Sequence, residues 1–159
     1  LMFNLLTHHE DRFADLRYRV MLLAQRIASA TQWLHERDEA QASPLAYYAS
    51  GTAAAACVRV AARLADRIRA LALRSGRPDQ AGVEPLQLLR APTLLLVGER
   101  DADGAEANQR ALALIRCDKA LIKVPGASDL FAELGVLDAA CRLVVDWMAR
   151  NIAPAPAAG

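Results

Sequence analysis

The sequence predicts an α/β protein, a three-layer α/β/α sandwich with a mostly parallel sheet. Short apolar runs alternate with stretches of helical period from the start of the chain to about residue 152. Turn-forming clusters of glycine, proline and aspartate lie between several of them. This alternation is typical of βαβ units, in which helices cover both faces of a parallel sheet. The length of 159 residues supports one domain with a core of its own.

Five apolar runs predict the strands. Each is nearly continuous, as expected for strands that are buried on both faces. The first run is Leu-Met-Phe-Asn-Leu-Leu, interrupted only by Asn4. In chain order, the expected strands are 1–6, 44–49, 68–73, 93–97 and 120–124.

Five further stretches predict the helices. In the longest, Val20, Leu23 and Ile27 recur at helical spacing among polar residues. The expected helices are 15–36, 52–66, 84–90, 105–116 and 135–151. Together these elements predict one domain over residues 1–152. Residues 153–159 consist of alanine, proline and glycine and are expected to form a disordered tail.

Composition argues against several classes of protein. The formal net charge is +1 and both signs are mixed along the chain, so no nucleic-acid partner is expected. No run is long and apolar enough for a membrane span, and no secretory signal is present. Cys57, Cys117 and Cys141 are scattered in apolar surroundings, which argues against a metal site or a disulfide framework. We therefore expect no cofactor, mostly buried reduced thiols and a cytoplasmic location.

Polar residues follow four of the expected strands. Ser50, Arg74, Asp101 and Asp129 each stand at or just after the end of an apolar run. The carboxyl ends of parallel strands meet at one edge of a sheet, where ligands of open α/β sheets bind. The sequence therefore predicts a site at that edge.

The segment around Ser50 has the layout of a nucleophile elbow, in which a sharp turn joins a strand to a helix. Such an elbow reads Gly-x-Ser-x-Gly and exposes the serine above the sheet. Here the five positions are Ala-Ser-Gly-Thr-Ala at 49–53, so Gly51 occupies the position of the nucleophile. Ser50 stands one residue early. Because a shift of one residue turns a side chain to the other face of a strand, Ser50 would need a local bulge to reach the site.

Four motifs in order resemble the dienelactone-hydrolase-like branch of the α/β-hydrolases. They are the elbow, the Arg-Ser-Gly-Arg-Pro-Asp turn at 74–79, Leu-Leu-Val-Gly-x-x-Asp at 95–101 and Val-Pro-Gly-Ala at 124–127. Small bacterial members of this branch, some fused to phosphoribosyltransferase domains, are most similar. The resemblance covers residues 1–152 and implies action on a small-molecule ester or lactone. The upstream strands and glycine-rich oxyanion loop of the family have no match in this sequence.

The resemblance places the triad acid at Asp101, the nucleophile at Gly51 and the histidine at Asp129. A serine hydroxyl needs an adjacent base, and a carboxylate with an ordinary pKa of about 3.9 is a weak one. We therefore expect a catalytically degenerate hydrolase. Two alternatives stay open: an active ester or lactone hydrolase with a site rebuilt around Ser50, and a non-catalytic interaction module.

The histidines and two arginines are further candidates for a functional role. His8 and His9 follow the first expected strand and could lie at the functional edge, whereas His35 is expected in solvent. Adjacent residues such as those at 8–11 rarely converge on one metal ion. Arg74 and Arg77 could hold an anion, with the alternative that Arg77 pairs locally with Asp79.

The start of the chain leads to an expectation about assembly. The sequence opens on Leu1 rather than methionine, and residues 1–6 are expected to form a strand at or near an exposed edge. Natural proteins rarely leave such an edge open. We therefore expect a homo-oligomer, or association with a missing N-terminal segment.

Overall fold

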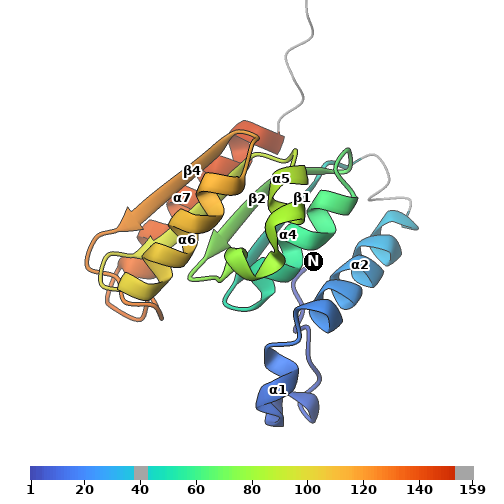
Figure 1. Cartoon of the computed structure of the whole chain (residues 1–159), viewed down its shortest axis with the longest axis horizontal. Coiled ribbons are helices and arrows are strands. Elements are labelled where there is room, and N and C mark those ends of the chain that lie inside the picture. The colour runs from blue at the N-terminus through green and yellow to red at the C-terminus, as the bar shows by residue number, and fades with distance from the viewer. Residues whose placement is uncertain (38–42, 153–159) are drawn as a thin grey trace, which may run out of the picture.

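The structure, a computed structural model, describes residues 1–37 and 43–152. Its centre is a four-stranded parallel sheet in the order β1-β2-β3-β4 (Figure 1). The strands are β1 (Leu45–Ser50), β2 (Ile68–Arg74), β3 (Thr93–Gly98) and β4 (Lys119–Val124). The predicted parallel sheet is confirmed. The expected tail at 153–159 lies outside the described residues.

Helices cover both faces of the sheet. Figure 1 shows α4 (Ala53–Arg63), α5 (Val83–Leu88) and α6 (Ala102–Leu114) on the near face and α7 (Val136–Ile152) on the far face. Helix α2 (Val20–His35) packs against α4. The predicted helix at 15–36 is divided, because a short helix α1 (Ala14–Arg17) ends before α2 begins. Two 3-10 turns, η1 (Glu10–Arg12) and η2 (Pro78–Ala81), complete the elements.

The central strands have two buried faces, which explains their continuous apolar runs. Leu71, Leu73 and Leu95 belong to the core under α4, α5 and α6, whereas Leu94 and Leu96 belong to the core under α7. The residues at 54–56 are fully buried alanines, so α4 lies close to the sheet.

The prediction of a strand at residues 1–6 is wrong. These residues adopt no strand, although Leu5 and Leu6 pack against the core on the α4 side. Strand structure needs a partner, and in the described part of the chain no strand pairs with this segment. It is instead tied to α2, because the Arg26 guanidinium donates to the Leu5 carbonyl and to the carboxylate of Glu10.

Glu10 is the anchor of this N-terminal segment. Its carboxylate also accepts hydrogen bonds from the backbone N–H and the hydroxyl of Thr7. The hydrogen bonds from Arg26, and then those from Thr7, lower the pKa of Glu10 to about 2.

Among the helices of the described residues, none is long and apolar enough to cross a membrane.

Candidate active site

The four polar residues predicted to gather at one edge of the sheet do follow parallel strands there. Backbone hydrogen bonds join the loops across this edge. Gly51 donates its N–H to the Arg74 carbonyl (3.3 Å), Ser75 to Leu96 (2.9 Å) and Glu99 to Val124 (3.1 Å). The prediction that these loops meet at one edge of the sheet is therefore confirmed. The chemistry of the edge depends on which side chains each loop carries.

The turn after β1 has the backbone of a nucleophile elbow. Gly51 has a φ of +60°, the left-handed region that side chains disfavour, and α4 begins at Ala53. The Gly51 carbonyl accepts a hydrogen bond from Ala54, which closes the turn (3.2 Å). A Cβ placed on Gly51 would meet no atom within 4 Å. The turn therefore keeps the shape and the open space of an elbow but carries no nucleophile.

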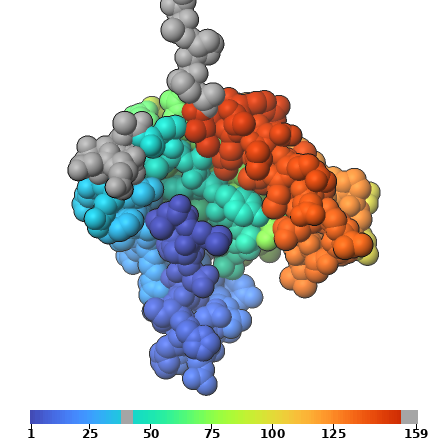
Figure 2. Space-filling model, turned by 180° about the vertical axis from the view of Figure 1, so that it is seen from behind, coloured from blue at the N-terminus to red at the C-terminus, as the bar shows by residue number. Residues whose placement is uncertain are grey.

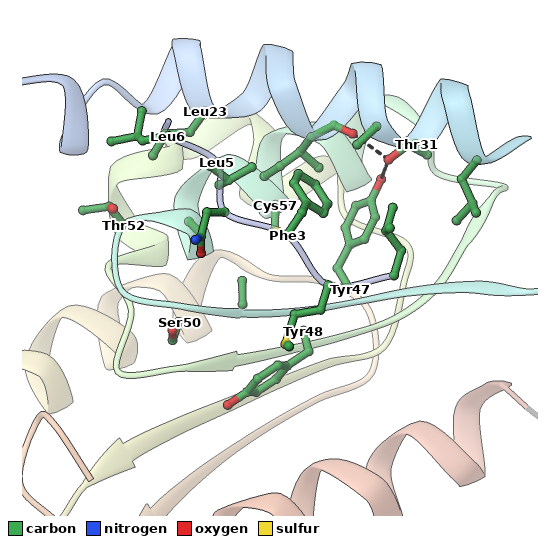
Figure 3. Close-up of a pocket in the computed structure, with 18 of the residues that line it drawn as sticks. Phe3, Leu5, Leu6, Leu23, Thr31, Tyr47, Tyr48, Ser50, Thr52 and Cys57 are labelled. Atoms are coloured by element: carbon green, nitrogen blue, oxygen red, sulfur yellow. Dashed lines mark hydrogen bonds between the residues drawn. The ribbon is translucent and has the colours of Figure 1, made fainter. Parts of the chain in front are cut away.

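Ser50 does not replace the missing side chain at the apex of the turn. It is exposed at the end of β1, in register with Arg74. Figure 3 shows Ser50 and Tyr48 on the opposite side of β1 from Tyr47 and Cys57. The register irregularity of β1 lies between Leu45 and Ala46, at the other end of the strand, rather than beside Ser50.

Asp101 caps a helix. Its carboxylate accepts a hydrogen bond from the Gly104 N–H (2.8 Å) at the start of α6. A Cβ on Gly104 would lie 2.0 Å from the same carboxylate, so the glycine is required for this close approach. The acid at the family position therefore has a structural role that needs no histidine.

The loop after β4 presents Asp129 to solvent on a firmly held backbone. The Arg100 N–H donates to the Ala127 carbonyl (3.0 Å), and the Gly126 N–H donates to the Glu99 carboxylate (2.9 Å). Phe131 closes the loop with its ring buried and a φ of +56°. The exposed position of Asp129 is thus fixed by its neighbours.

Glu133 and Arg100 complete this support. The Glu133 carboxylate accepts the Ser128 N–H (3.1 Å) and pairs with the Arg100 guanidinium, which also donates to the Gly126 carbonyl (2.6 Å). Hydrogen bonds from its own backbone and from Ser128 lower the pKa of Glu133. Our sequence reasoning missed these residues. The sequence showed only that one charged residue, Arg100, follows β3 and that another, Glu133, lies in the loop after β4.

The two arginines of the turn after β2 differ. Arg77 donates two hydrogen bonds to the Asp79 carboxylate (3.0 and 2.9 Å), so the alternative of a local pairing is confirmed. Arg74 lies with its guanidinium carbon 5.3 Å from the centroid of the Phe131 ring. Its buried Nε has no hydrogen-bond partner among the described residues, nor has the hydroxyl of Ser75.

The three histidines have different surroundings. His9 contacts the ring of Phe13 edge-on (5.5 Å), and His35 ends α2. His8 is exposed and lines the groove described below. No group of three histidine, cysteine, aspartate or glutamate residues with metal-site geometry occurs in the part of the chain that the structure describes.

The three cysteines differ in burial. Cys57 is buried, Cys117 is intermediate and Cys141 is exposed, which corrects the expectation that most would be buried. Burial raises the pKa of the Cys57 thiol to about 12, so it is a poor nucleophile.

A groove of about 930 Å³ runs along β1 to the elbow. Its walls are β1, α2, α4 and residues 1–6, and it reaches Ser50 and Thr52 (Figure 3). Between α2 and β1, the Thr31 hydroxyl donates to the Ile27 carbonyl and therefore accepts from the Tyr47 hydroxyl (both 2.7 Å). Figure 2 shows the first residues, in dark blue, beside α2 and over the region of β1 and α4.

Comparisons with known proteins agree with this fold. The chain superposes on a dienelactone hydrolase from Anabaena variabilis with a TM-score of 0.89 and 34% identity, covering 94% of this chain and 71% of that one. Est1E from Butyrivibrio proteoclasticus has a TM-score of 0.68 at 12% identity, covering 84% of this chain and 72% of that one, which indicates the shared fold alone. No family model matches the sequence.

The chain thus belongs to the dienelactone-hydrolase-like family of α/β-hydrolases. It is also 41% identical over 147 residues to a protein of two Mycobacterium tuberculosis strains that is provisionally named a phosphoribosyl transferase. The match covers 92% of this chain, which spans 33% of the length of these curated relatives.

Proposed function

We propose that this chain is a catalytically degenerate hydrolase that does not turn over esters at its elbow. The observation that carries the proposal is Gly51. Its backbone has the left-handed conformation of an elbow and leaves open space for a side chain, yet the position carries none. A glycine cannot form an acyl-enzyme at this position.

The histidine position supports the same proposal. Asp129 is exposed and places a carboxylate where a serine hydrolase needs the imidazole that takes the proton of the nucleophile. Loss of triad members in serine hydrolases costs a factor of about 10⁶ in rate. The carboxylate of Asp101 caps α6, a role that does not depend on catalysis.

Restoring both missing groups tests the proposal. We expect no turnover of activated esters by the wild-type chain, and measurable turnover by the double variant Gly51→Ser with Asp129→His. The two single variants are the matched controls, because each lacks either the nucleophile or the base. Wild-type turnover that disappears in Ser50→Ala would contradict the proposal.

A second candidate is an active hydrolase of carboxylic esters or lactones, rebuilt around Ser50. It is favoured by the groove, whose lining includes both Ser50 and His8. Against it, Ser50 is on the opposite side of β1 from the groove residues Tyr47 and Cys57, and no hydrogen bond joins it to His8 in the described structure. Comparing wild-type turnover with that of Ser50→Ala and His8→Ala separates the two functions.

A further inference from the structure

Arg74, the last residue of β2, differs from the other half-buried arginines of the described residues, which are Arg26 and Arg59. Arg26 donates a hydrogen bond to the Leu5 carbonyl and Arg59 donates one to the Ala81 carbonyl. In the described part of the chain, the Arg74 guanidinium has neither a hydrogen-bond acceptor nor an ion pair. A charged donor that is partly removed from water without an acceptor is unfavourable, so this position favours an acceptor from outside the chain.

The nitrogens of the Arg74 guanidinium differ in access. Nε is buried without a partner, whereas the two Nη groups, which also lack partners, remain accessible to solvent. The ring of Phe131, whose centroid lies 5.3 Å from the guanidinium carbon, belongs to the buried core under α7. The contact with this ring holds the guanidinium in place. The Nη groups can therefore donate to an acceptor that arrives from solvent without a large movement of the side chain.

Ser50 and Tyr48 lie on the same face of the sheet as Arg74. Ser50 is paired in register with Arg74, and neighbouring strands are about 4.8 Å apart. Side chains alternate along a strand, and both Ala72 of β2 and Ala46 of β1 pack in the core under α7. Arg74, Tyr48 and Ser50 follow these alanines at even spacing, and Figure 3 shows Tyr48 and Ser50 on one side of β1. Both residues are exposed, so their hydroxyls can donate to the same acceptor as Arg74.

The acidic residues of the neighbouring loops do not neutralise Arg74. The Glu133 carboxylate pairs with Arg100, and the Asp101 carboxylate caps α6. Asp129 is exposed and forms no ion pair with Arg74 in the described structure. The charge of the Arg74 guanidinium is therefore available to an anion.

We propose that Arg74, Ser50 and Tyr48 bind one phosphate group of a small molecule. The two Nη groups and the two hydroxyls are donors from neighbouring strands, and a phosphate group offers three strong acceptor oxygens to them. A carboxylate offers two, and the burial of Nε withdraws one edge of the guanidinium from bidentate pairing. Arg77 takes no part, because its guanidinium is paired with Asp79. This binding needs no nucleophile, so it goes beyond the proposed loss of ester turnover.

Titration with inorganic phosphate at constant ionic strength tests the site, with the backbone amides followed by NMR. We expect saturable shifts at the amides of Tyr48, Ser50 and Arg74, and about tenfold weaker binding of acetate. The sample contains no ester, so the result does not depend on whether the elbow catalyses hydrolysis.

Side-chain variants assign the binding to these residues. Arg74→Gln removes the charge and should weaken phosphate binding about tenfold. Arg69→Gln removes the same charge from an exposed position at the other end of β2 and is the matched control that should retain binding. Ser50→Ala and Tyr48→Phe each remove one exposed hydroxyl and should weaken binding about threefold. These two variants test the site even where Arg74→Gln fails to fold.

Three results would overturn the proposal. The first is that phosphate causes no saturable shift at these amides, while circular dichroism shows that the chain is folded. The second is equal loss of binding in Arg74→Gln and Arg69→Gln, or unchanged binding in both hydroxyl variants, which would reduce the effect to unspecific attraction of charge. The third is binding of acetate as tight as that of phosphate, which would make a carboxylate the ligand.

Discussion

The loop after β1 and the loops after β3 and β4 lie at the same edge of the sheet but are held by different means. The elbow at Gly51 is shaped by backbone hydrogen bonds and by the close approach of Gly76 to Ala54. The other two loops also share backbone hydrogen bonds, but side chains add to them, above all Arg100 and Glu133. The turn at Gly51 has the shape of an elbow without a side chain at its apex, because backbone groups alone hold it.

The largest expected effect is a difference in the free energy of unfolding between two glycine-to-alanine variants, Gly98→Ala after β3 and Gly51→Ala after β1. A Cβ on Gly98, at the end of β3, would lie 2.4 Å from the Ser128 carbonyl oxygen, whereas a Cβ on Gly51 meets open space. We expect Gly98→Ala to lower the free energy of unfolding by about 3 kcal/mol, since backbone must move. Gly51→Ala should cost about 1–2 kcal/mol, from the left-handed φ alone.

Urea unfolding of the two variants measures both free energies. The variants are each other's control, because both add a single methyl group to a glycine at the same edge. Equal losses of unfolding free energy in the two variants would show that the loop after β1 and the loops after β3 and β4 are held alike, which would contradict the difference between them.

The sequence predicted the sheet well because β2 and β3 are buried runs that pair with each other, and because β1 and β4 each pair with one of them. It failed at residues 1–6, because strand structure depends on a neighbour that composition does not reveal. It located Gly51 at the elbow, since the motif is local. It offered the pairing of Arg77 with Asp79, which is local, but it could not find the pairing of Arg100 with Glu133, because that contact depends on how distant loops meet.

The role of Asp101 gives the next prediction. If the carboxylate serves only to cap α6, Asp101→Ala should lower the free energy of unfolding by about 1 kcal/mol. Asp101→Asn should retain most of the stability, because asparagine caps helices almost as well. Thermal or urea unfolding measures both. If Asp101→Ala left the free energy of unfolding unchanged, the hydrogen bond to Gly104 would not stabilise the helix.

The smallest expected effect is a difference in pH dependence between the two sides. The carboxylate of Glu133 holds the Ser128 N–H, and its pKa lies below the usual 4.5 because its own backbone and Ser128 donate hydrogen bonds to it. A lowered pKa in the folded state stabilises the loop above pH 4.5 and ceases to do so as the pH falls through the lowered value. The turn at Gly51 is closed by backbone groups, which do not titrate.

Acidification from neutral pH through this range should therefore reduce the protection factor of the Ser128 amide while that of Ala54, which donates to the Gly51 carbonyl, stays constant. Hydrogen exchange followed by NMR measures both amides in one sample. In Glu133→Gln the Ser128 amide should already be less protected at neutral pH and should show no further loss on acidification, since the amide side chain does not titrate. A parallel loss at Ala54 would instead indicate that the whole edge opens as one unit, and the distinction between its two sides would not hold.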